Sequence, residues 1–117
     1  MKERFFLEVK DIPQREDVKL LEFKGEIDIT NSHYVIHRVF SLINNGYKYL
    51  IADFGKLEHI NSSGIFNLLR CYAKLQENGG WMKFIHLEEP LFSVLRSLGI
   101  TRVFSVYKDL EEALKDS

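Results

Sequence analysis

The stretch YKYLIADF, residues 47–54, constrains the fold more than any other segment of the chain. Its last six residues are almost continuously apolar, which is typical of a strand buried on both faces. Residues 63–77 then follow the period of an amphipathic helix. A doubly buried strand followed by such a helix favours an α/β fold with parallel strands. The shared apolar face of the helix comprises Ile65, Leu68, Leu69, Tyr72 and Leu75.

The other segments complete the order β-β-α-β-α-β-α-β-α. This order predicts the α/β class, with a mixed sheet of four to five strands and about four helices. An N-terminal antiparallel hairpin forms one edge of the sheet, and crossover helices make the remaining strands parallel. Besides the two segments above, strands are predicted at residues 5–9, 18–23, 81–87 and 103–107, and helices ending near residue 44, at 91–98 and at 109–117.

Length and composition limit the class of protein. The 117 residues suit a single domain, 1–117, and 45% hydrophobic with 28% charged residues is an ordinary globular composition. A net charge of −1 argues against a nucleic-acid partner. No apolar run approaches the roughly 20 residues of a membrane helix, and the start MKERFFLEVKD lacks the apolar core of an export signal. We therefore expect a cytoplasmic protein without membrane insertion.

No sequence pattern supports catalysis, a metal site or a cofactor. The segment INSSG differs from the G-x-S-x-G motif of serine hydrolases, because Ile60 stands where the first glycine should be. His33 and His37 have a spacing that can chelate a metal, but no HExxH motif accompanies them. The single cysteine, Cys71, allows no internal disulfide and fits packing better than reactivity. We expect no enzyme, although a triad assembled from distant residues would leave no trace in local spacing.

The polar corner Asn61-Ser62-Ser63-Gly64 stands between the buried strand and the helix. The first N–H groups of a helix lack partners within it and attract negative charge, so the corner suits a bound anion or a phosphorylated serine. Gly64 is expected to leave the approach open, and Ser62 or Asn61 to cap the helix. Phe66, on the flank of the apolar face, is either exposed to a partner or covered by a loop. The simpler interpretation is that NSSG is only a helix cap.

Four segments then stand out in order: FKGEIDITNS, YLIADFGKLEHINSSGIFNLL, ENGGWMKFIHL and LRSLGITRVFSVYKDLEEAL. Together they resemble the STAS domain of bacterial anti-sigma factor antagonists, also called anti-anti-sigma factors. The resemblance extends from about Phe5 to Leu114, and the closing LGI…VF…Y…LEEAL rhythm is typical of the family as an ensemble. It implies a STAS fold, a mixed sheet with helices packed against it, which agrees with the element order above.

The resemblance also implies a regulatory mechanism called partner switching. An unphosphorylated antagonist binds an anti-sigma factor, which is a serine kinase of the histidine-kinase-like ATPase type, and a sigma factor is released. The kinase phosphorylates the antagonist on a serine, and the complex then dissociates. A metal-dependent serine phosphatase restores the free hydroxyl.

The family motif D-S-[ST/A]-G assigns the phosphorylated position to Ser62. The segment GEID matches the family's G-x-[LI]-D, which implies that Asp28 lies near the phosphorylation corner. One departure is Asn61, where the family has aspartate: asparagine still caps a helix, but it removes a negative charge beside the acceptor. The predicted partner-binding residues are Asp28, Asn61, Ser62, Ser63, Gly64 and Phe66.

Three functions follow from these observations. The first is an anti-sigma factor antagonist that is regulated at Ser62. The second is a STAS accessory subunit of a transporter or signalling scaffold, without a phosphorylation switch. The third is an enzyme with Ser62 as its nucleophile, which the sequence supports least.

Overall fold

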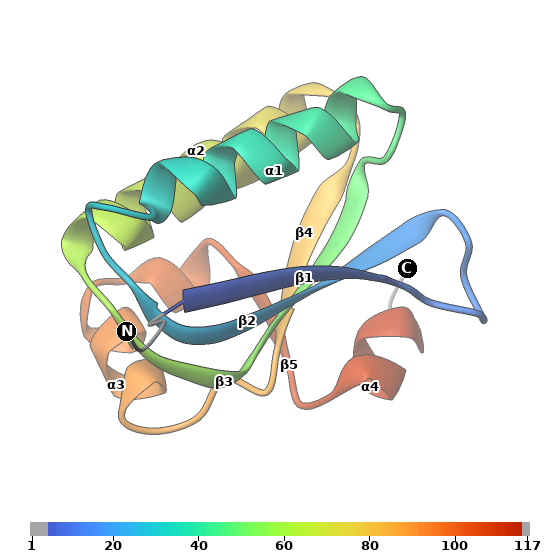
Figure 1. Ribbon diagram of the computed structural model, residues 1–117. Helices are drawn as coiled ribbons and strands as arrows, with labels where there is room; N and C mark the ends of the chain where they lie inside the picture. The colour runs from blue at the N-terminus through green and yellow to red at the C-terminus, as the bar shows by residue number, and fades with distance from the viewer. Residues whose placement is uncertain (1–4, 116–117) are drawn as a thin grey trace.

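Five strands form one mixed sheet in the computed structural model, which describes residues 5–115. The strands lie in the order β1-β2-β3-β4-β5, so that neighbours in the sheet are also neighbours in the chain (Figure 1). β1 and β2 are antiparallel, whereas β2 to β5 are parallel, which confirms the predicted hairpin and crossovers. Their bounds are β1 Phe5–Asp11, β2 Val18–Ile27, β3 Tyr49–Ile60, β4 Trp81–Ile85 and β5 Ser105–Tyr107.

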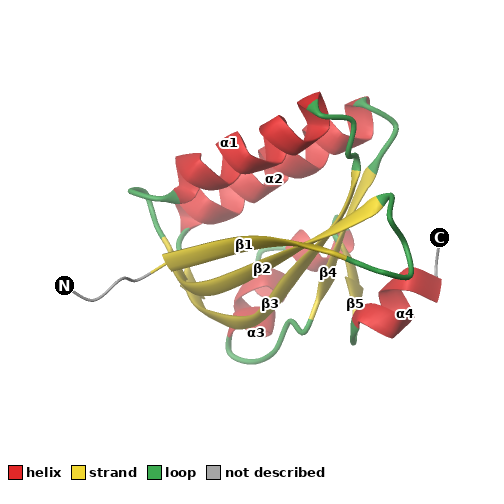
Figure 2. Cartoon of the chain, turned by 45° about the vertical axis from the view of Figure 1, so that its right-hand side comes forward, coloured by secondary structure: helices red, strands yellow, loops and turns green. Residues whose placement is uncertain are grey.

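Within residues 5–115, the sheet is accompanied by four α-helices and one short 3₁₀ helix, of which the last, α4, follows the final strand. α1 and α2 run side by side over one face of the sheet, and α4 packs on the opposite face (Figure 2). The last two positions of the predicted final helix, residues 116 and 117, lie outside the described residues. The bounds are α1 Ser32–Asn44, α2 Ser62–Glu77, α3 Leu91–Ser97, η1 Ile100–Arg102 and α4 Leu110–Lys115.

The centre of β3 is buried on both faces, as its apolar run predicts. Leu50 and Ala52 belong to the main core, which α1 and α2 cover, whereas Ile51 belongs to a smaller core beneath α4. All three side chains are fully buried. The main core also contains a row of aromatic ring contacts that joins Phe23, Phe54, Phe84 and Phe104.

β2 and β3 extend beyond the ends predicted at residues 23 and 54. They continue in parallel as far as Ile27 and Ile60, through two register shifts in the pairing. The sequence did not predict these extensions because most of their residues are polar. Their only large buried apolar side chains are Leu57 and the two terminal isoleucines. The extensions carry both strands to a common edge, where the candidate site lies.

Smaller differences occur where strands meet turns. β4 ends at Ile85 instead of residue 87, because His86 adopts a left-handed conformation with φ of 57°, which interrupts the extended backbone. β5 begins at Ser105 instead of residue 103, since Phe104 turns into the core and stacks on Phe84 with ring centroids 4.2 Å apart. β3 begins at Tyr49, two residues later than predicted.

Candidate functional site

Ser62 is the first residue of α2 and is exposed. The residue before it, Asn61, is the helix cap: its backbone is extended and its Oδ1 accepts a hydrogen bond from the N–H of Gly64 at 2.9 Å. The carbonyl of Asn61 also accepts from the N–H of Ile65 at 3.0 Å. Of the two caps that the sequence allowed, the structure therefore selects Asn61, and Ser62 presents its side chain to solvent.

Gly64 is buried against the ends of β2 and β3. A Cβ at this position would lie 2.7 Å from side-chain atoms of both Ile27 and Ile60, which is closer than carbon atoms approach without displacement. The expectation that this glycine leaves the approach from outside open was wrong, because the space it frees faces inward. Gly64 instead allows the first turn of α2 to approach the sheet closely.

Asp28 directly follows the carboxyl end of β2, next to the carboxyl end of β3, where the corner begins. Ile27 and Ile60 are partners in the parallel ladder, and the N–H of Asn61 donates to the carbonyl of Ile27 at 3.1 Å. The residues that follow each isoleucine, Asp28 and Asn61, therefore begin the two adjacent loops. The structure thus brings together the GEID and NSSG segments, which are more than 30 positions apart in the chain.

The segment from Asp28 to Asn31 is held by its own polar groups. The Oδ1 atom of Asp28 accepts from the N–H of Thr30 at 2.9 Å and from its hydroxyl at 2.6 Å. The Oδ1 atom of Asn31 accepts from the N–H of Asp28, and its amide donates to the carbonyl of Glu26 at 2.9 Å. These contacts fix the carboxylate of Asp28 in the loop between β2 and α1.

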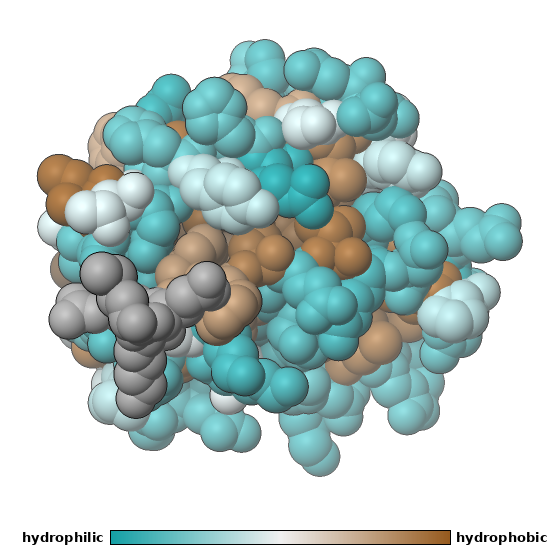
Figure 3. Space-filling model, viewed as in Figure 1, coloured by the Kyte–Doolittle hydropathy of each residue, from teal (hydrophilic) through white to brown (hydrophobic). Residues whose placement is uncertain are grey.

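Two large apolar side chains are exposed on the elements that meet at the corner. Phe66, one turn after Ser62, is 64% exposed, so the alternative that a loop covers it was wrong. Ile29, which is not among the predicted partner-binding residues, is 66% exposed and directly follows Asp28. The available signal was an isoleucine between two polar residues, Asp28 and Thr30. Figure 3 shows hydrophobic surface at the end of the molecule where α1 and α2 begin.

Beneath this surface lies a buried polar pair that the sequence patterns did not reveal. The amide nitrogen of Asn67 donates to Oγ of Ser32 at 2.8 Å, and both side chains are buried. This bond joins the second turn of α2 to the first residue of α1. The signal was an asparagine inside a helix whose neighbours are apolar, because asparagine is a poor helix former.

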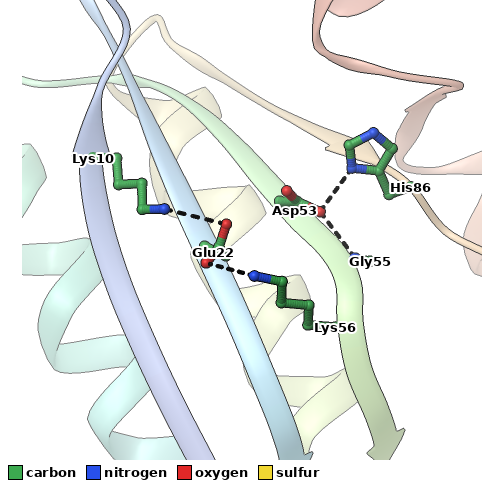
Figure 4. A network of polar contacts seen from close by, with 6 residues as sticks. All are labelled: Lys10, Glu22, Asp53, Gly55, Lys56 and His86. Atoms are coloured by element: carbon green, nitrogen blue, oxygen red, sulfur yellow. Dashed lines mark hydrogen bonds and ion pairs between the residues drawn. The ribbon is translucent and has the colours of Figure 1, made fainter.

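A second polar cluster lies on the sheet, away from the corner. It comprises Lys10, Glu22, Asp53, Gly55, Lys56 and His86 (Figure 4). Nδ1 of His86 lies 2.9 Å from Oδ1 of Asp53, a pairing between distant residues that local spacing did not reveal. Within residues 5–115, no hydrogen bond connects either residue to Ser62, so the structure assembles no triad at the corner.

Three further observations concern the described residues. Burial raises the pKa of the Cys71 thiol to about 12, which keeps it protonated near neutral pH. Residues 5–115 contain no group of three His, Cys, Asp or Glu side chains that could hold a metal ion. In the same range, no helix is long and apolar enough to cross a membrane.

Solved structures share this fold. An anti-sigma factor antagonist from Mycobacterium paratuberculosis is 21% identical, covers 95% of this chain and 92% of its own, and has a TM-score of 0.81. The Bacillus cell fate determinant SpoIIAA, in its phosphorylated form, is 17% identical over 94% and 97% of the two chains, with a TM-score of 0.71. A sulfate transporter family protein from Wolinella succinogenes is 16% identical over 86% and 84%, with a TM-score of 0.74.

These identities, all at or below 21%, establish the shared architecture alone. The family itself is established by sequence, because the model of the STAS domain matches residues 9–113. This range contains all five strands except the first four residues of β1, together with the corner at Ser62 and the segment at Asp28. The chain belongs to the STAS domain family.

Proposed function

We propose that this chain is an anti-sigma factor antagonist that acts by partner switching in the cytoplasm, without catalytic activity of its own. Its unphosphorylated form binds an anti-sigma factor serine kinase of the histidine-kinase-like ATPase type, which frees a sigma factor. Phosphorylation of Ser62 releases the kinase, and a metal-dependent serine phosphatase restores the hydroxyl. Two structural neighbours support this proposal: an anti-sigma factor antagonist, and SpoIIAA, another such antagonist, in its phosphorylated form.

The observation that carries the proposal is the position of Ser62. Its side chain is exposed at the first position of a 16-residue helix, and a different residue, Asn61, performs the capping. Exposed Phe66 lies one turn further along the helix, and Asp28 begins the adjacent loop. An acceptor serine that is free of a structural task and beside an apolar side chain suits a reversible protein contact.

Phosphate at this position changes the energy of a complex without requiring a change of fold. A phosphoserine carries about −1.5 to −2 charges at neutral pH, and these must be desolvated if the kinase covers Ser62. In the free chain, the N–H groups at the start of α2 and the helix dipole can receive the phosphate. A difference of about 1.4 kcal/mol between the two complexes is already tenfold in affinity.

Asn61 changes the charge beside Ser62 relative to the aspartate of the family motif. Its neutral side chain places no negative charge next to Ser62, so it repels a phosphate less than an aspartate would, by a modest amount at an exposed site. Its amide oxygen still accepts from Gly64, so the helix start is intact. The expected result is a corner that keeps its geometry and accepts phosphate with less repulsion.

A second candidate function is an accessory role in a transporter or signalling scaffold, without a phosphorylation switch. The sulfate transporter family protein among the structural neighbours favours it. In that case Ser62 would serve only as the first residue of α2, and its charge would not affect partner choice.

Paired pull-downs from host lysate separate the two candidates. The baits are the Ser62→Ala and Ser62→Asp forms, and Ser41→Asp, at an exposed serine in the last turn of α1 and outside the predicted contact, serves as a matched control for an added charge. The proposal expects the alanine form to retain an ATPase-type kinase and the Ser62→Asp form to lose it. Capture of the same transporter or scaffold proteins by both Ser62 forms, with no kinase, would instead support the accessory role.

A further inference from the structure

Buried polar side chains are rare in this protein. Within residues 5–115, only Ser32, Asn67 and Lys83 are both polar and buried. Lys83 fastens α4, because its Nζ donates to the carbonyl of Ala113 at 2.8 Å. Ser32 and Asn67 bond to each other, 35 positions apart in the chain. Such a pair adds little stability compared with apolar side chains of the same shape, so its presence calls for another reason.

The Asn67–Ser32 bond connects α2, which carries Ser62, to α1, which follows the Asp28–Asn31 segment. Asn67 lies five positions after Ser62 on α2, and Ser32 directly follows the segment from Asp28 to Asn31. The N–H of Ser32 also donates to the carbonyl of Asp28 at 2.9 Å, so the bond acts on that segment without an intervening flexible residue. Figure 1 shows that α1 and α2 begin at the same end of the molecule.

A second connection lies on the other side of Ser62. The N–H of Asn61 donates to the carbonyl of Ile27, and Gly64 packs against the side chains of Ile27 and Ile60. Ser62 therefore lies between two connections to the residues that flank the Asp28–Asn31 segment. The Asn61–Ile27 bond precedes Ser62 in the chain, and the Asn67–Ser32 bond follows it. Of these connections, only the Asn67–Ser32 bond is made by two side chains, so only this one can be removed by substitution without altering the sheet.

We propose that Asn67 and Ser32 are a positioning pair, which holds the Asp28–Asn31 segment at a fixed spacing from Ser62 so that the kinase contacts both. This inference rests on the proposed function of Ser62. Neither side chain can reach a partner, because both are buried. Their effect on binding comes through preorganisation: without the bond, the segment must be ordered when the complex forms, which weakens affinity.

Three variants separate positioning from a merely structural role. Ser32→Ala and Asn67→Leu each leave one buried polar group without its partner, and we expect each to lower Tm by about 4 to 8 °C. The double variant removes both polar groups, so its Tm should return close to that of the wild type. The probe is the ATPase-type kinase that the Ser62→Ala bait retains. We expect the double variant to bind this kinase about tenfold more weakly than the wild type, despite its recovered Tm.

Amide hydrogen exchange gives a readout that needs no partner. In the double variant, the hydrogen-bonded N–H groups of Asp28, Thr30 and Ser32 should exchange faster than in the wild type, while those at the centre of β3 remain unchanged. Wild-type affinity and wild-type exchange in the double variant would overturn the positioning pair. If no form of the chain captures a kinase, the proposed function fails, and the exchange result alone then decides whether the pair holds the segment.

Discussion

Asn61 and Ser62 are adjacent, yet the structure gives them separate tasks. Asn61 uses its side chain to cap α2, whereas Ser62 is exposed and free to accept a modification. The sequence could predict that one of them caps the helix, because both residue types are favoured there. It could not assign an inward role to Gly64, since that role depends on two isoleucines that lie beyond the predicted ends of their strands.

At this scale, Gly64→Ala tests the close packing of α2 on the sheet. The added Cβ would lie 2.7 Å from atoms of Ile27 and Ile60, so the variant should lose about 1 to 3 kcal/mol of unfolding free energy. Urea denaturation measures this loss, with Ser63→Ala in the same turn as the control that changes stability little. An alanine variant as stable as the wild type would mean that the helix is not packed as described.

Cys71 allows a test of burial by chemical reactivity. Burial raises the pKa of its thiol to about 12, so the native protein at pH 8 should react very slowly with a disulfide reagent such as DTNB, and the urea-unfolded protein rapidly. The raised pKa also makes the free energy of unfolding depend on pH. The unfolded thiol ionises at a lower pH than the folded one, so unfolding is favoured as pH rises from about 9 toward 12. Rapid labelling of the native protein would contradict the burial of Cys71.

At the scale of elements, strand and helix types were predictable, whereas several ends were not. The period of α2 and the apolar run of β3 identify both elements, because each pattern is long and regular. The ends of β2 and β3 escaped prediction because their last residues are mostly polar. These residues are extended because the two strands pair with each other there. The Asn67–Ser32 bond escaped for a similar reason, since it requires knowing that α1 and α2 begin side by side.

The start of α2 can be tested as an element by exchanging its cap. Asn61→Ala removes the acceptor for the N–H of Gly64, and we expect a loss of about 1 kcal/mol in unfolding free energy. Asn61→Asp keeps an acceptor and places a negative charge at the positive end of the helix, so its stability should match or exceed that of the wild type. Urea titrations of the three proteins decide the matter. Equal stability of the alanine and aspartate variants would show that the side chain of residue 61 does not cap the helix.

At the scale of the whole molecule, parallel topology creates the site. β2 and β3 end at one edge of the sheet, and the helix that follows each strand begins there, so two segments distant in sequence become neighbours. The family resemblance implied that Asp28 lies near Ser62, and the bond between their chain neighbours Ile27 and Asn61 shows that the two segments adjoin. Composition and charge alone could not have located it, because they carry no information about which segments adjoin.

The central claim is that the charge state of Ser62 decides whether the kinase binds. The most direct test is a calorimetric titration of the captured anti-sigma kinase with three forms of the full chain: unmodified, Ser62→Ala, and phosphorylated at Ser62. We expect the unmodified and alanine forms to bind alike, and the phosphorylated form to bind at least about tenfold more weakly. Equal affinity of all three forms would contradict the account.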